Sequence, residues 1–224
     1  MVELTIRRMD GGQPLVIEHA ERLAEAFFRV DPSSRRPDGI DQRLGLTDPN
    51  RIVREDLRTI NSTFVARSPA AAWQDLFDAG DLPWLKALDP DWDLISLEES
   101  DWRRFGCRDR LVDAFEKIRG KYRAQAVATK ILHLKRWRLV PVLDSLVAIQ
   151  VGARSSASTI DLVEHLRTQG RANLEALGSV QSYLGDRGID RSFVRILDAL
   201  IWTSHPATLT HPLIGLIRDW TAGE

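Results

Sequence analysis

The chain has 224 residues, which is enough for one large domain or two smaller lobes around a substantial apolar core. Its 43% hydrophobic residues and formal net charge of −1 are typical of a soluble globular protein and exclude a disordered chain. They also exclude strong attraction of the whole molecule to nucleic acid or anionic membranes, so any such attraction must come from a local patch.

The first elements can be predicted in chain order. Residues 1–17 contain an alternating segment, a DGG turn signal and a second apolar piece, which together predict a small β-hairpin. A helix follows, because apolar residues recur at the spacing of one helix face: Ala20, Leu23, Ala24, Phe27 and Phe28. The stretch 31–46 is interrupted by proline, glycine and serine and predicts a flexible loop.

Helical patterns dominate the rest of the chain. Asp48 followed by Pro49 predicts a helix that begins at Pro49, and Asp144 stands just before the apolar run SLVAIQV, which Gly152 ends. We find no internal repeat and no low-complexity tract. The predicted fold class is all-α, as a single helical domain over residues 1–224 with a short N-terminal hairpin.

The sequence also limits the cellular compartments and the cofactors that can be expected for this protein. The only cysteine, Cys107, excludes an internal disulfide and a multi-cysteine zinc site and fits a reducing compartment. No apolar run has the length of a membrane span, and the N-terminus lacks the pattern of a signal peptide. No glycine-rich phosphate loop and no histidine pair at i, i+4 is present. We therefore expect a cytoplasmic protein with no membrane association, no metal and no cofactor.

Charge is distributed unevenly along the chain. Residues 71–100, the acidic segment, hold eight acids against one base, whereas residues 101–140, the basic segment, hold twelve bases against four acids. One interpretation is two solvated helix faces that attract one another. The other is a nucleic-acid-binding surface that faces phosphates. Its candidate residues are Arg103, Arg104, Arg108, Lys121, Arg123, Lys135, Arg136 and Arg138.

Lys130 and Asp144 are the candidate catalytic residues. On a helical wheel centred on Val127, Lys130 lies on the flank of the buried face, where its stem can contact apolar neighbours while the ammonium reaches a cleft or solvent. An amine partly withdrawn from water and a nearby carboxylate are what a DNA glycosylase with lyase activity needs. The structural alternatives stay open: Lys130 as a surface or salt-bridged lysine, and Asp144 as a helix cap.

Two blocks carry a resemblance to known proteins. ATKILHLKRWRLVPVLDSLV and EDLRTINSTFVARSPAAAW, together about a quarter of the chain, resemble a bacterial domain family of unknown function. The first block is also remotely similar to the second half of helix-hairpin-helix DNA glycosylases. That similarity implies a catalytic aspartate at Asp144 and a lysine nucleophile at Lys130. The glycine-rich hairpin of those enzymes is replaced here by IRGKYRAQAVATK, so the resemblance implies a scaffold more than a reaction.

Two functional hypotheses follow from these patterns. The first is a nucleic-acid-associated helical protein with DNA as its partner and a divergent or inactive glycosylase-like site. The tryptophans Trp73, Trp84, Trp92 and Trp102 supply either a base-stacking platform or core packing. The alternative is a non-catalytic assembly module, a homo-oligomer in which the acidic segment of one subunit meets the basic segment of another.

Overall fold

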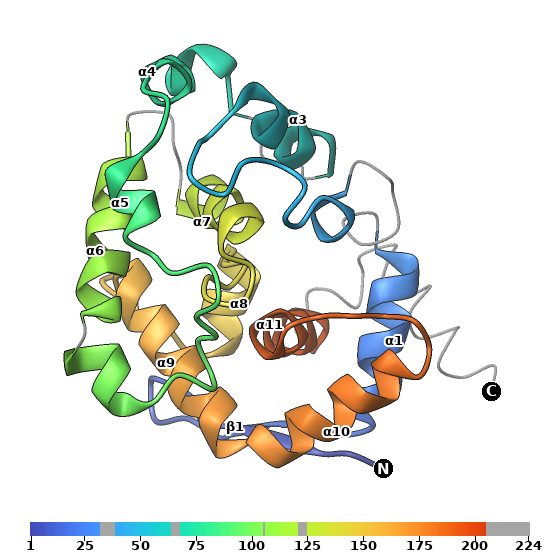
Figure 1. Cartoon of the computed structure of the whole chain (residues 1–224). Coiled ribbons are helices and arrows are strands. Elements are labelled where there is room, and N and C mark those ends of the chain that lie inside the picture. The colour runs from blue at the N-terminus through green and yellow to red at the C-terminus, as the bar shows by residue number, and fades with distance from the viewer. Residues whose placement is uncertain (32–38, 64–67, 105, 121–124, 205–224) are drawn as a thin grey trace. The chain divides into compact units, whose positions relative to one another are not determined.

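The chain divides into two compact units, and the computed structural model describes residues 1–31, 39–63, 68–104, 106–120 and 125–204 (Figure 1). Unit 1 combines Met1–Asp31 with Asp144–Glu224, and unit 2 is the continuous segment Pro32–Leu143.

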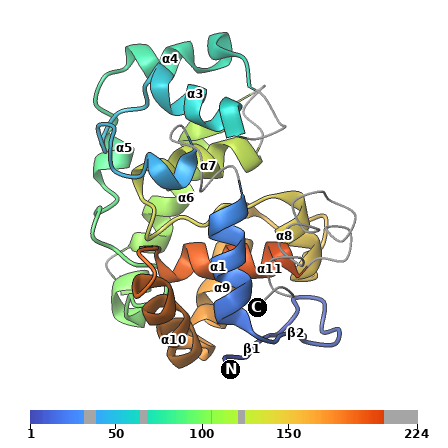
Figure 2. The ribbon, with the colours of Figure 1, turned by 90° about the vertical axis from the view of Figure 1, so that its right-hand side faces the viewer.

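Unit 1 consists of helices and one short hairpin (Figure 2). Its elements are β1 (Leu4–Ile6), β2 (Leu15–Ile17), α1 (Ala20–Val30), α8 (Ser145–Gln150), α9 (Thr159–Ala172), α10 (Leu174–Gly185) and α11 (Phe193–Thr203). The predicted stripe of α1 is confirmed in large part, because Ala20, Ala24, Phe27 and Phe28 are buried. Phe27 packs edge-on against Trp202 of α11, with ring centroids 5.8 Å apart. This contact fixes α1 on the α11 side of the unit 1 core.

Side-chain amides at the C-terminal end of α9, from Gln169 and the capping residue Asn173, hold one edge of the hairpin. β1 and β2 pair antiparallel with Thr5 opposite Val16, so the backbone groups of Thr5 point away from β2. Asn173 accepts the Thr5 N–H at 3.0 Å and donates to the Thr5 carbonyl at 2.9 Å. Gln169 accepts the Arg7 N–H at 2.8 Å. These amides stand in for a third strand, because they offer the donors and acceptors of a peptide group.

The elements described in unit 2 are all helical, and turns and loops connect them. Its elements are η1 (Ile40–Gln42), α3 (Arg54–Thr63), η2 (Ala70–Trp73), α4 (Gln74–Asp78), α5 (Pro83–Lys86), η3 (Ser100–Arg104), α6 (Cys107–Ile118) and α7 (Gln125–Lys135). Every residue of α7 from Val127 to Lys135 is buried, and α7 contacts both α3 and α6. A helix buried on all sides needs polar partners for each of its charged residues.

The all-α fold with its N-terminal hairpin is confirmed. The single-domain assignment over residues 1–224 stays a prediction. Of the predicted loop, residues 32–38 lie outside the described part of the chain. The loop prediction does not hold for Ile40–Gln42, a 3-10 turn whose Ile40 is fully buried and therefore anchors this segment in a core.

Among the described residues, no helix combines the length and apolar character that crossing a membrane requires. The predicted cytoplasmic location stays a prediction.

Candidate functional site

Lys130 lies in the middle of α7 and is more buried than its sequence pattern predicts. Only 5% of its surface is exposed, whereas we expected a half-exposed flank of the helix. The difference arises because α7 is buried around its whole circumference. Thr129 donates to the Leu143 carbonyl at 3.3 Å, and the His133 ring bonds to the Val140 carbonyl at 2.6 Å. Thr129 and His133 thus bond to the segment that follows α7 in unit 2.

Asp144 caps α8, as the structural alternative predicted. Its Oδ1 accepts the N–H groups of Leu146 and Val147, both at 3.0 Å, which satisfies two of the donors that a helix start leaves open. Lys130 belongs to unit 2 and Asp144 to unit 1. The convergence of their side chains, and with it their catalytic role, stays a prediction.

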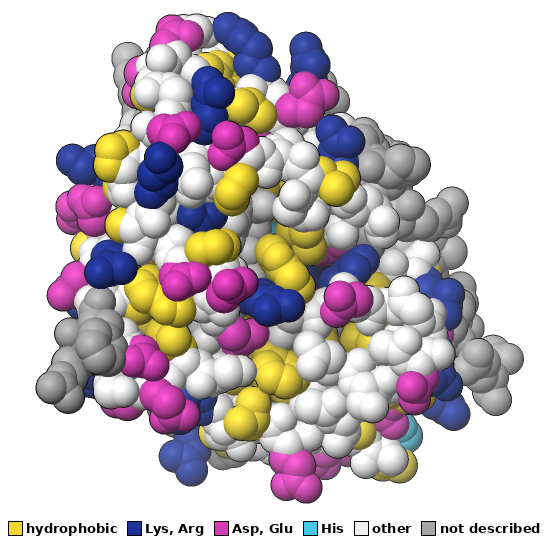
Figure 3. All heavy atoms as spheres, in the orientation of Figure 1, with side chains coloured by type: hydrophobic (Ala, Val, Ile, Leu, Met, Phe, Trp, Pro, Cys, Tyr) yellow, Lys and Arg dark blue, Asp and Glu magenta, His cyan; other side chains and the backbone are white. Residues whose placement is uncertain are grey.

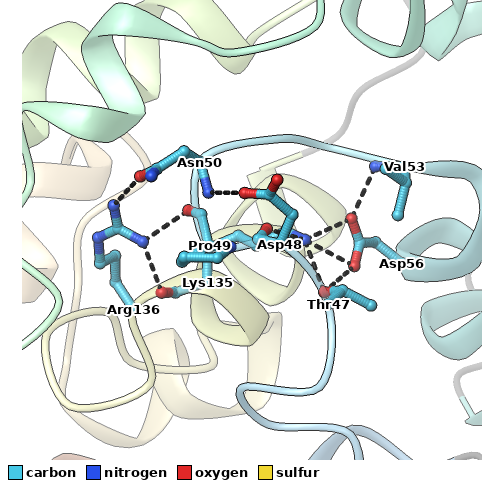
Figure 4. Close-up of polar contacts among 8 residues, drawn as sticks. All are labelled: Thr47, Asp48, Pro49, Asn50, Val53, Asp56, Lys135 and Arg136. Atoms are coloured by element: carbon cyan, nitrogen blue, oxygen red, sulfur yellow. Dashed lines mark hydrogen bonds and ion pairs between the residues drawn. The ribbon is translucent and has the colours of Figure 1, made fainter.

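Lys135 forms a buried ion pair at the end of α7. Its Nζ lies 2.7 Å from Oδ2 of Asp56 on α3, and neither side chain is exposed (Figure 4). The same Nζ donates to Thr47 Oγ1 at 2.7 Å and to the Asp48 carbonyl at 3.0 Å. Burial lowers the pKa of the Lys135 ammonium, and the Asp56 carboxylate opposes that shift. Asp56 also accepts the Val53 N–H at 2.8 Å, so it both pairs with Lys135 and caps the start of α3.

Arg136 distributes its donors over several backbone carbonyls of unit 2. It donates to the carbonyls of Leu85 and Leu88, both at 2.6 Å, and to that of Pro49 at 2.7 Å. Asn50 Oδ1 accepts a further bond at 3.1 Å (Figure 4). Because a guanidinium carries five N–H groups in a planar fork, one side chain can hold two separate loops in this way.

The same contacts explain why α3 starts later than predicted. The helix begins at Arg54 and not at Pro49. The carbonyls of Asp48 and Pro49 are held by α7 and its end, and Asp48 accepts the Asn50 N–H at 2.8 Å in a turn. A turn whose carbonyls point at Lys135 and Arg136 cannot also form the first turn of a helix.

These buried positions correct the predicted basic surface. Lys135 and Arg136 are 4% and 1% exposed, so their charge does not reach the surface, contrary to the prediction. Arg103 pairs with Glu99 at 2.5 Å and Arg108 with Asp109 at 3.5 Å. Arg138 is exposed, as predicted.

The remaining residues of the predicted basic surface lie outside the part of the chain that the structure describes. They are Lys121, Arg123 and the side chain of Arg104. The face drawn in Figure 3 carries basic and acidic side chains interspersed with one another. On this face, charge density alone therefore does not define a binding surface.

Two arginine–tryptophan pairs stand out on unit 2. The Arg138 guanidinium carbon lies 4.8 Å from the ring centroid of Trp137, and that of Arg110 lies 5.5 Å from the centroid of Trp92. The Leu94 N–H donates to the Arg138 carbonyl at 3.0 Å, which ties the segment of Trp92 to that of Trp137. We call Trp92, Arg110, Trp137 and Arg138 the Arg–Trp surface.

The two arginines of this surface are accessible to a ligand. Arg110 and Arg138 are exposed, and Trp92 and Trp137 are half-buried. Neither arginine forms an ion pair with an acid in the described part of the chain. By contrast, Trp73 and Trp102 are buried at 0% and 2% exposure and serve the core.

Sequence reasoning missed Arg110 and Trp137, although the segment KRWRL places Trp137 between two arginines, a pattern that could have pointed to it. It also missed Thr47 and Asp56, because their bonds to Lys135 join positions 88 and 79 residues apart. No local pattern reveals a contact at that separation.

The described residues offer no site for a metal ion or for a reactive thiol. No group of three or more potential ligands gathers within the part of the chain that the structure describes. His205 and His211 lie outside that part, and Cys107 is fully buried.

Comparison with known protein families identifies a match over most of the chain. A family model described as "Family of unknown function (DUF6308)" matches residues 34–205, most of the chain. No curated protein and no solved structure matches the chain. The expected relation to a domain family of unknown function is thus confirmed, and none of the comparisons supports the resemblance to helix-hairpin-helix glycosylases.

Proposed function

For a chain that belongs to DUF6308, a family of unknown function, we propose nucleic-acid binding through the Arg–Trp surface of unit 2. The observation that carries the proposal is the Leu94–Arg138 hydrogen bond of 3.0 Å, because it brings two arginine–tryptophan pairs onto adjoining segments. Arginine beside aromatic rings is the combination with which many proteins bind nucleic-acid strands.

Each pair prepares its arginine for a phosphate. A guanidinium held over an indole ring is partly desolvated and loses less side-chain freedom when it binds. Arg110 also donates to the Ala87 carbonyl at 2.9 Å, which fixes the plane of its fork. A planar fork can then offer two parallel N–H bonds to phosphate oxygens.

The assembly alternative has less support. The acidic and basic segments both lie in unit 2 and already bond to each other there: Glu99 pairs with Arg103, and Arg136 donates to Leu88. Contacts satisfied within one chain are not available to a second copy. Light scattering at low and high salt tests this alternative, since a monomer under both conditions excludes salt-sensitive assembly of the proposed kind.

A narrower version of the proposal adds the glycosylase and lyase chemistry. In it the neutral Lys130 amine attacks the sugar C1′, and the N-glycosidic bond breaks. The base leaves with the bonding electron pair and takes up a proton, and the amine loses a proton on the way to a Schiff base. What supports this version is the withdrawal of Lys130 from water. Borohydride trapping tests it: no adduct, or one that persists in Lys130→Ala, removes it.

Fluorescence anisotropy with labelled oligonucleotides tests the binding proposal. The double variant Arg110→Ala/Arg138→Ala should bind about 30- to 160-fold more weakly, because each lost charged contact is worth about 1–1.5 kcal/mol and the two together about 2–3 kcal/mol.

The matched control is Arg22→Ala/Arg58→Ala, which removes the same charge from exposed positions on α1 and α3. Equal affinity of the two double variants, or no binding by the wild type, would refute the proposal.

A further inference from the structure

We infer that Arg136 is a positioning residue for the Arg–Trp surface. It fixes the turn of residues 85–88, and the Ala87 carbonyl of that turn holds Arg110 for a backbone phosphate. This inference rests on the proposed function and deepens it, because it names the part of the nucleic acid that the surface takes. Arg136 is 1% exposed, so it acts on a ligand only through other residues.

The Arg136 guanidinium bonds to both ends of this turn. Its Nε donates to the Leu88 carbonyl and its Nη2 to the Leu85 carbonyl, each at 2.6 Å. Ala87 lies between these two residues in the sequence, and its carbonyl accepts a bond from Arg110 Nη1 at 2.9 Å. Because two bonds from one planar fork fix both the position and the orientation of the turn, the Ala87 carbonyl is held in one place.

A second contact ties the same segment further along the chain. The Leu94 N–H donates to the Arg138 carbonyl at 3.0 Å, and Arg138 follows Arg136 by two residues. Both ends of the segment that carries Trp92 are thus bonded to the three residues from Arg136 to Arg138. One buried side chain therefore connects the two halves of the Arg–Trp surface.

The charges that this arrangement presents suit phosphates. Arg110 and Arg138 are exposed, and Arg110 uses one of its five N–H groups on the Ala87 carbonyl, so the others can bind phosphate oxygens. Asp89 and Asp91, exposed on the neighbouring segment, oppose this charge and limit the affinity. Phosphate contacts carry no sequence information. The expected ligand is therefore a strand of any sequence, bound through its backbone.

The variant Arg136→Lys tests the positioning role, because an ammonium cannot replace a fork that bonds to two carbonyls. Anisotropy with a single strand of about 12 nucleotides should show about two- to tenfold weaker binding, since Arg110 must then be ordered when the strand binds. In the Arg110→Ala background the same substitution should change the affinity by less than about twofold, whereas in the Arg138→Ala background it should keep its full effect. A merely structural role would weaken binding alike in both backgrounds.

A second variant and a control accompany this test. Pro83→Gly perturbs the same turn from an exposed position at the start of α5, and it keeps the test open if the lysine variant does not fold. Without the proline ring the helix before Ala87 is less rigid, so the affinity should fall and again depend on Arg110. Thr47→Val is the matched control, because it removes hydroxyl bonds from the neighbouring Lys135 contacts; it should lower the melting temperature and leave the affinity unchanged.

A strand of the same sequence with neutral methylphosphonate linkages tests the ligand class, and it should bind at least about tenfold more weakly. Equal binding of the neutral strand would overturn phosphates as the ligand. No effect of the folded variants, or equal effects in the two arginine backgrounds, would overturn the positioning role, and in both cases nucleic-acid binding itself would stand. No binding of the natural strand by the wild type would overturn the proposed function.

Discussion

Removal of the Asp56 carboxylate should destabilise unit 2 far more than removal of an exposed acid. Asp56→Ala leaves the Lys135 ammonium, whose side chain has no exposure, without its counter-ion. An uncompensated buried charge costs about 3–5 kcal/mol, and the lost cap on the Val53 N–H adds about 1 kcal/mol. The expected loss is thus about 4–6 kcal/mol, a large part of the roughly 5–15 kcal/mol that stabilises a folded protein.

Urea unfolding followed by circular dichroism measures this loss, and hydrogen exchange in α3 and α7 localises it to unit 2. Asp113→Ala, at an exposed position of α6, is the control and should change the free energy of unfolding by less than about 0.5 kcal/mol.

A double variant separates charge from packing. Asp56→Leu/Lys135→Met should lose less stability than the sum of its single variants, because it leaves no buried charge unpaired. Strict additivity, or an Asp56→Ala variant within about 1 kcal/mol of the wild type, would refute the argument that the ion pair is buried and coupled.

Three further predictions concern other contacts. Burial lowers the pKa of His165 in the folded state, so the unfolded state binds a proton at a higher pH than the folded state does. The free energy of unfolding should therefore fall as the pH drops below about 6.5, the ordinary pKa of histidine. The variant His165→Gln should remove that part of the pH dependence. Gly152→Ala places a Cβ 2.6 Å from the Asp10 side chain at φ +69, so it should cost more stability than Gly188→Ala, which has φ +74 and open space; equal losses in urea unfolding would contradict the steric part. Arg136→Lys should lower the melting temperature, because an ammonium cannot reach all the carbonyls that the guanidinium fork holds; an unchanged melting temperature would show that these bonds contribute little.

Local patterns in the sequence predicted local structure well. The apolar stripe from Ala20 to Phe28, the hairpin of residues 1–17 and the cap at Asp144 each depend on residues a few positions apart, and all three are found. Such features are set by helix and strand periodicity and by the donors that a helix start leaves open.

The burial of the predicted site residues could not be predicted in this way, because their partners are far away in the sequence. In a basic run, Lys135 and Arg136 look like Arg138, yet only Arg138 is exposed. What decides between burial and exposure is a carboxylate and a set of carbonyls 48 to 87 residues away. A single sequence contains no signal for those contacts, so the extent of the basic surface could not be predicted from it.

The order of the segments along the chain has a consequence for synthesis on the ribosome. Unit 2 is one uninterrupted stretch, whereas unit 1 needs both Met1–Asp31 and the residues from Asp144 onward. At about 5–20 residues per second, the hairpin and α1 emerge on the order of ten seconds before α9 and Asn173, whose amides bond to the hairpin. We therefore expect the apolar side of the nascent N-terminal segment to stay uncovered until α10 and α11, which pack against α1, have also been synthesised.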